Sequence, residues 1–405
     1  MKTIITYLFI FFFSFSLIAQ EKEQPPKGGE PKNFTLPKKE VVKLDNGLTL
    51  VMVPYGSIPK ATIRFSIKTG NIDEGENQVW LSDLLADLLE EGSTTKTSKQ
   101  IANEMAGMGG NLNISVGLHT SSISSSVLYE FAPEAIMLMA DVLKNPKFPT
   151  EEMDRLKADM KRDLSVRLSR PRSQANRDFY AQLYPDHPYG RVYPSDEMID
   201  SYSVEDIKKF YNEHFGAIRT TVYVAGNFDG EAVKETVEKA FSNWLEGAPS
   251  KYNVAKPVVS NEVKIIDRPG APQSTIYYGL PVIGPSHEDY IALDVTNSIL
   301  GGSFASRITS NIREDKGYTY GIGSGMVSMK HSGYLSISTE VGADVCAAAL
   351  TEIYLEIERL RNSLIPSSVL ELVKNYMLGS ILKSIDGPFD VAAKWRGYMK
   401  YGFGI

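Results

Sequence analysis

The sequence is poor in the residues that build disulfides and thiolate metal sites. It contains a single cysteine, Cys346, and five histidines among 405 residues. One cysteine cannot form an internal disulfide or supply a cysteine-rich zinc module. The chain also lacks an excess of basic residues, because 43 Lys and Arg stand against 49 Asp and Glu. The net charge of −6 gives no general attraction for nucleic acid, so no nucleic-acid partner is expected.

Long apolar runs are confined to the N-terminus. Lys2 precedes an apolar run from Ile4 to Ala19, which has the charged start and small final residue of a secretory signal. Residues 1–19 are therefore predicted to be a signal peptide, with an uncleaved anchor as the alternative. Residues 20–40, rich in Pro, Gly and charge, are predicted to be a flexible linker. No later segment is apolar enough to cross a membrane, so the mature chain is expected in a bacterial periplasm or outside the cell.

The chain contains an internal repeat, in which predicted strands and helices occur twice in the same order. In residues 41–245 a hairpin turn at Asn46-Gly47 is followed by alternating strands and by helices with apolar residues three and four apart. Residues 262–405 repeat much of this order, and residues 246–261 link the copies. The pattern predicts an α+β fold of two homologous domains, each a largely antiparallel sheet covered by helices, forming half of a clamshell chamber.

Several helices have predicted ends. Thr150 precedes two glutamates and is expected to cap a helix that runs to Leu168. Another helix is predicted over Ser367–Lys383. The second copy stops before a counterpart of the first copy's last helix, strand and helix. We therefore expect that roughly 50 residues of the second domain are truncated from this chain.

Several motifs resemble one family. The helix that ends at Glu91-Gly92-Ser93-Thr94 and the motif His187-Pro188-Tyr189-Gly190 are similar to the first domain of pitrilysin or insulinase-type zinc peptidases. The run Leu300–Arg307, followed by Ile312–Tyr320, is similar to the second-domain signature of this family and is the most specific match. The resemblance covers about Val41–Ile405. It is to the degenerate, non-catalytic chains of heterodimers similar to mitochondrial processing peptidase.

The resemblance also implies that the catalytic motif is lost. Active members carry His-x-x-Glu-His on a helix and a Glu about 76 residues later, which hold zinc beside a general base. Here Asp83 and Asp87 stand at the histidine positions, Ala86 at the base and Asp163 at the distal ligand. Ala86 accepts no proton, so no intact catalytic site, metal ligand or cofactor is expected in this chain.

The residues alone allow two other interpretations of these acids, a site for a different metal ion or a polar helix face. Three carboxylates suit Ca²⁺ or Mg²⁺ better than Zn²⁺. The simpler interpretation is that the polar residues of this stretch form the solvated face of an amphipathic helix, namely Ser82, Asp83, Ala86, Asp87 and Glu90.

Five other residues are predicted to bind substrate. The resemblance places Arg313 and Tyr320 where second-domain members keep an Arg and a Tyr that hold a peptide and its oxyanion. The alternative is an ordinary packed strand edge. Gly109, Gly110 and Asn111 open a strand that receives the substrate backbone in active relatives. The alternative there is a tight turn.

Together these features predict a non-catalytic, substrate-binding subunit of a secreted heterodimeric peptidase that acts on peptides or small unfolded proteins. A separate chain carrying His-x-x-Glu-His would supply the zinc. Two alternatives stay open. One is a stand-alone structural or binding protein with no proteolytic role, and the other is a peptidase with an unrecognised site.

Overall fold

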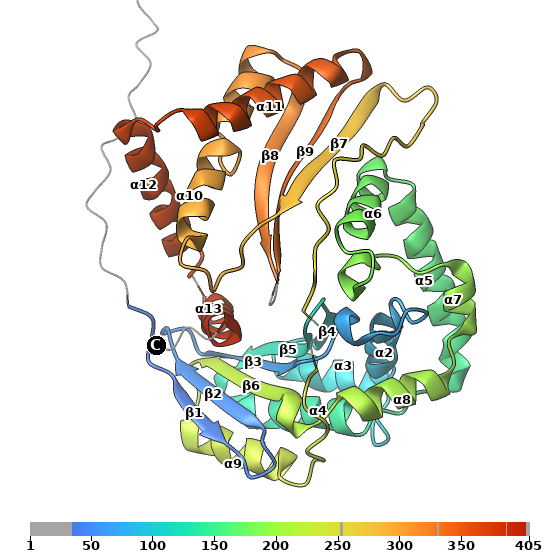
Figure 1. Ribbon diagram of the computed structural model, residues 1–405. Coiled ribbons are helices and arrows are strands. Elements are labelled where there is room, and N and C mark those ends of the chain that lie inside the picture. Colours follow the sequence, from blue (N-terminus) through green and yellow to red (C-terminus); the bar gives the residue numbers. More distant parts are fainter. Residues whose placement is uncertain (1–34, 252–253, 330–331, 386, 402–405) are drawn as a thin grey trace, which may run out of the picture. The chain divides into compact units, whose positions relative to one another are not determined.

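The computed structural model describes residues 35–251, 254–329, 332–385 and 387–401 (Figure 1). The predicted signal peptide and most of the predicted linker, up to residue 34, lie outside these ranges. Every helix and strand given below belongs to a compact unit that begins at Pro37. Within the described residues, no helix combines the length and the apolar character needed to span a membrane.

The first sheet has six strands in the described part of the chain, which are β1 (Glu40–Lys43), β2 (Thr49–Pro54), β3 (Lys60–Ile67), β4 (Asn113–Val116), β5 (Ser121–Leu128) and β6 (Thr220–Gly226). Their order is β1-β2-β6-β3-β5-β4, which makes β4 an edge strand. β1 and β2 form the predicted antiparallel hairpin, and Gly47 has the positive φ of +88° that its turn requires. β6 lies parallel to β2 and antiparallel to β3.

A large apolar core joins this sheet to seven helices of the described chain, which are α2 (Leu81–Glu90), α3 (Ser98–Gly107), α4 (Ala132–Lys144), α5 (Met153–Leu168), α7 (Asp196–Ser201), α8 (Val204–His214) and α9 (Gly230–Phe241). The helical spacing of apolar residues explains this burial. In α2, Leu81, Leu84 and Leu88 fall on one face and are fully buried. On the neighbouring strand, Phe65 packs edge-on against Phe241 of α9.

The second sheet, as far as it is described, orders its strands β7-β9-β8 from β7 (Gln273–Pro281), β8 (Thr319–Ser328) and β9 (Gly333–Gly342). All its pairs are antiparallel, and a bulge interrupts the register between Thr319 and Ile322. A smaller core joins the sheet to α10 (Tyr290–Leu300) and α11 (Cys346–Asn362). α12 (Ser367–Lys383) follows with the predicted bounds.

Three helices are not predicted from the pattern: α6 (Pro171–Leu183), α7 (Asp196–Ser201) and α13 (Pro388–Tyr401). α6 comes from the first copy but packs on β7 of the second sheet, where Asn176 Nδ2 donates to Tyr277 Oη at 3.1 Å. α13 comes from the second copy and packs on β6 and β3 of the first sheet. Each copy therefore packs one helix on the sheet of the other copy. The two sheets with their covering helices confirm the predicted α+β class.

Two local predictions are corrected. Thr150 does not cap a helix with its side chain, because it opens a short 3₁₀ turn, Thr150–Glu152, and α5 begins only at Met153. The strand predicted near Asn111–Gly117 begins later, at Asn113, because the chain before it is still tied to α3, where Gly109 and Gly110 donate to carbonyls.

Candidate functional site

The loop before α2 fixes the start of the helix that carries the degenerate motif. α2 has no side-chain cap at Trp80, which takes a left-handed φ of +69°. The buried Glu74 carboxylate replaces that cap, since it accepts hydrogen bonds from the backbone N–H groups of Trp80 at 3.1 Å and Ser82 at 2.9 Å. It also accepts from the Ser82 hydroxyl. Glu74 thus satisfies helix donors that would otherwise be unpaired.

Asp83 and Asp163 lie close together across α2 and α5, and each is already engaged. Asp83 Oδ2 accepts a hydrogen bond from Asn71 Nδ2 at 2.7 Å. Asp163 Oδ2 accepts from Arg167 Nε at 2.7 Å, one turn along α5. The charges of Asp163 and Arg167 act on Asp83 in opposite directions, with Arg167 lowering its pKa and Asp163 raising it. The guanidinium also lies over the Trp80 ring, 5.4 Å from its centroid.

These residues do not fit a catalytic zinc site. Ala86 carries no polar side chain, so the general-base position has no proton acceptor. Among the described residues no three His, Cys, Asp or Glu side chains are grouped so that they could hold a metal ion. The cation beside the acids at the distal-ligand position is Arg167, a residue of the chain itself.

Burial raises the pKa values of the acids in this region. It raises the pKa of Glu74 to about 7, against the opposing effect of its hydrogen bonds. Burial likewise raises the pKa of Asp83 to about 6. The pKa of Asp87 is also raised to about 6, first by burial and then by the negative charges of Glu90 and Asp83. The acids raise one another's pKa values along α2, and the positive charges of Arg167 at Asp83 and Arg155 at Asp87 partly offset this effect.

The interpretation of this stretch as a solvated polar face is wrong for part of it. Ser82 is 1% exposed and Ala86 is 9% exposed. The loop that contains Glu74 covers this side of α2, so the polar side chains there bond to one another rather than to water. Asp87 and Glu90, further along the helix, reach the solvent with part of their side chains while the rest is covered.

Gly109, Gly110 and Asn111 lead from α3 into the edge strand β4, which runs beside α2. Gly109 has a φ of +78°, which suits glycine. A Cβ on Gly110 would come within 2.6 Å of the Ser126 carbonyl oxygen on β5. The Asn111 side chain donates to Asn113 Oδ1 at 2.9 Å. The turn is thus packed tightly against β5, and β4 beyond it has no strand on its outer side within the described chain.

Arg313 and Tyr320 lie together on the second copy. Arg313 sits in a π-helical segment, Thr309–Asp315, an uncommon backbone form that often marks functional sites. Its guanidinium lies 4.5 Å from the ring centroid of Phe304 and 5.5 Å from that of Tyr320. Tyr320 is 91% exposed and Phe304 is 69% exposed. Tyr320 is therefore not packed into a strand edge, and the Arg313 guanidinium, which also pairs with Glu314 Oε1 at 3.3 Å, lies near two exposed rings.

The structure brings the predicted residues together in two groups. Asp83, Ala86, Asp87 and Asp163 form one group around α2, and Arg313 with Tyr320 forms the other. Within the described residues no hydrogen bond or ion pair joins the group around α2 to the group of Arg313 and Tyr320. Reasoning from the sequence missed Glu74, Arg167 and Phe304. The i,i+4 spacing of Asp163 and Arg167 was the available signal for that pair.

Two family models match the chain in succession. A model described as insulinase (peptidase family M16) matches residues 51–193, and one described as peptidase M16 inactive domain matches residues 201–377. An uncharacterized zinc protease of Rickettsia felis is 26% identical over 79% of this chain and 77% of its own length. An uncharacterized zinc protease of Bacillus subtilis is 26% identical over 84% of this chain and 83% of its own length.

Solved structures share the fold. A protease from Helicobacter pylori superposes with a TM-score of 0.83 at 19% identity, over 91% of this chain and 90% of that one. A peptidase M16 inactive domain from Pseudomonas fluorescens superposes with a TM-score of 0.81 at 22% identity, over 91% of this chain and 89% of that one. These comparisons confirm the resemblance that the motifs indicate.

Proposed function

Because the chain belongs to the insulinase family of peptidases, family M16, we propose that it is a non-catalytic, substrate-binding subunit of a heterodimeric zinc peptidase. One observation carries this proposal. The position of the catalytic base is Ala86, and the carboxylate at the distal-ligand position is paired with Arg167 instead of being free to hold a metal ion. The base position of this site therefore has no group that could activate water.

The retained second-domain residues give the subunit its role. Arg313 offers a planar guanidinium whose N–H groups suit peptide carbonyls, and the exposed Tyr320 hydroxyl can donate to a developing oxyanion. These groups would act on a peptide whose scissile bond lies at the zinc of another chain. That partner would carry His-x-x-Glu-His, and each chain would form half of a closed chamber for peptides or small unfolded proteins.

We place this assembly outside the cytoplasm, in the periplasm of a bacterium or beyond the cell. The support is the N-terminal sequence, where Lys2 and the apolar run to Ala19 have the order of a secretory signal.

The test is a peptidase assay on separate and mixed chains. The full chain is purified alone and with the family member of the same genome that carries His-x-x-Glu-His, and hydrolysis of an internally quenched peptide is measured. We expect no hydrolysis by this chain alone and a rate for the mixture well above that of the catalytic chain alone. If mixing adds nothing, the chain is a stand-alone binding protein. If this chain alone hydrolyses the peptide, it has an active site of its own.

A further inference from the structure

The second sheet has two unlike faces. On one face, Ile322, Leu335 and Ile337 are buried in the core shared with α10 and α11. Side chains alternate along a strand, so the intervening residues point to the other face. Most of these are small or hydroxyl-bearing: Gly321, Gly323 and Gly325 of β8, Ser336, Ser338 and Glu340 of β9, and Thr275 and Tyr277 of β7. The strand register pairs Ser338 with Gly323 and Tyr277, Ser336 with Gly325, and Glu340 with Thr275.

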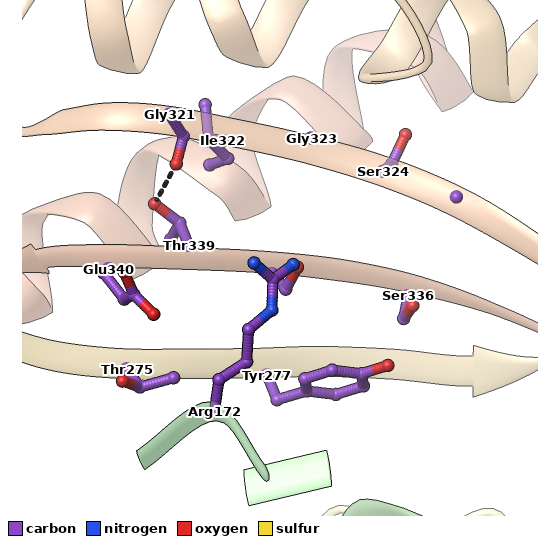
Figure 2. Close-up of a pocket in the computed structure, with 12 residues that line it drawn as sticks. Arg172, Thr275, Tyr277, Gly321, Ile322, Gly323, Ser324, Ser336, Thr339 and Glu340 are labelled. Atoms are coloured by element: carbon purple, nitrogen blue, oxygen red, sulfur yellow. Dashed lines mark hydrogen bonds between the residues drawn. The ribbon is translucent and has the colours of Figure 1, made fainter. Parts of the chain in front are cut away.

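A cavity of about 500 Å³ lies on this face (Figure 2). That volume falls in the range of small-ligand sites, roughly 300–1,000 Å³. The glycines of β8 leave room in it, because a Cβ on Gly321 or Gly325 would meet no atom within 4 Å. The cavity wall is therefore bare backbone on one strand and serine hydroxyls on the next, a surface that an extended polar chain can approach closely.

Arg172 supplies a cation to this cavity. Its side chain reaches from α6 across β7 toward β9 (Figure 2), where Nη2 donates to Ser338 Oγ at 2.7 Å. In the described chain no carboxylate pairs with this guanidinium, and no further hydrogen bond uses its remaining N–H groups. An arginine fork with free N–H groups matches the geometry of a carboxylate, which it can bind through two hydrogen bonds.

Glu340 lines the same cavity and adds the opposite charge. Its carboxylate has no ion pair among the described residues, and it is not paired with Arg172. Both side chains are exposed, and a ligand that carries a carboxylate for Arg172 and an N–H donor for Glu340 would match the two charges. A small inorganic anion matches only the first charge and leaves most of the cavity empty.

We propose that this cavity binds the C-terminal end of a peptide. Arg172 holds the free carboxylate, the serine hydroxyls of β9 bond to the last residues, and Glu340 accepts a hydrogen bond from a backbone N–H of the bound chain. The proposal rests on the proposed function only for the choice of a peptide as the ligand. It requires neither zinc nor a catalytic partner.

The test is calorimetric titration of the full chain with matched peptides. The probes are acetyl-Gly-Gly-Ala with a free carboxylate, the same peptide as its C-terminal amide, and acetyl-Gly-Asp-Ala amide, which carries its carboxylate on a side chain. We expect the free acid to bind at least about tenfold tighter than either amide, which corresponds to loss of one charge-assisted hydrogen-bonded pair. Arg172→Gln abolishes this preference. Arg162→Gln, which changes an exposed arginine of α5, leaves it intact.

A second variant distinguishes loss of peptide binding from loss of the fold. Gly325→Val puts a β-branched residue into open space on β8, so it fills part of the cavity while favouring the strand. It is expected to weaken binding of the free acid with unchanged thermal unfolding. Equal binding of the acid and its amide, equal binding of the aspartyl amide, or no binding at all overturns the proposal. Because the titration uses this chain alone, failure of the partner assay leaves its result unaffected.

Discussion

Arg167 Nε lies 2.7 Å from Asp163 Oδ2, so a guanidinium pairs with the carboxylate that the family resemblance assigns to the distal-ligand position. The pair spans one turn of α5, and the charge of Arg167 also lowers the pKa of Asp83 on α2. A cation of the chain itself therefore stands beside acids that would otherwise repel one another. The acids of this site are compensated in part by a cation of the same chain.

The acids of α2 make the stability of the chain depend on pH. Burial raises the pKa of Glu74 to about 7 and the pKa values of Asp83 and Asp87 to about 6. The folded chain thus binds these protons more tightly than the unfolded chain. The free energy of unfolding is therefore expected to fall as pH rises from about 4 to about 7.

Asp87→Asn removes one of these titrations without disturbing the network of Glu74. We expect the variant to match the parent at pH 4 and to be more stable at pH 8, by less than about 1 kcal/mol because Asp87 is partly in water. Urea unfolding across this pH range measures the difference. The exposed Asp186→Asn is the control. A variant that is less stable than the parent at pH 8 contradicts this account.

Glu74→Ala tests the anchoring of α2. It leaves the backbone N–H groups of Trp80 and Ser82 without their buried acceptor. Each unpaired buried donor costs about 1–3 kcal/mol, so we expect the free energy of unfolding to fall by about 3 kcal/mol. Glu76→Ala, in the exposed part of the same loop, is the matched control and is expected to change little. Equal stability of the two variants in urea would refute the anchoring role.

Two glycines at the end of α3 give a paired test of the turn into β4. Gly110→Ala brings a Cβ within 2.6 Å of the Ser126 carbonyl and is expected to cost about 1–3 kcal/mol. Gly107→Ala places its Cβ in open space on the helix and is expected to stabilise by about 0.5–1 kcal/mol. Thermal unfolding of both variants should therefore show shifts of opposite sign, and shifts of the same sign contradict the observed packing.

Arg313 and Tyr320 are expected to act only in the assembled peptidase. In a mixture with the catalytic chain, Arg313→Ala or Tyr320→Phe should lower the rate of peptide hydrolysis by about 10²-fold, the usual effect of removing one oxyanion donor. Unfolding of the isolated Tyr320→Phe variant should be unchanged, because Tyr320 is 91% exposed. Tyr376→Phe, on an exposed position of α12, is the control. A mixture that retains its full rate with Arg313→Ala assigns the pair no role in catalysis.

The elements that the sequence predicts well are those with strong local signals. The hairpin at Asn46-Gly47 and the helix Ser367–Lys383 depend on a turn dipeptide and on a regular apolar pattern. α6 gave no such signal, because its aromatic residues serve contacts with the other copy's sheet, as in the pairing of Tyr180 with Tyr334. The cavity on the second sheet depends on strand register, which spacing along the chain does not reveal.

The candidate site likewise contains some residues that the sequence indicates and others that only the structure reveals. The family resemblance, rather than local spacing, pointed to Asp83, Ala86 and Asp163. The capping role of Glu74 was not predictable, since it requires a loop to fold back over the start of α2. The stacking of Phe304 on Arg313 likewise requires two segments to meet, and only the structure shows this contact.

The zinc content of the purified full chain tests the central claim most directly. Elemental analysis is made on the isolated chain after dialysis against zinc-containing and then zinc-free buffer, without a catalytic partner. The account predicts less than about a tenth of an equivalent, because carboxylates without imidazole or thiolate hold zinc weakly and Arg167 already occupies their neighbourhood. About one equivalent of zinc retained per chain would contradict it and would identify a metal site in this chain.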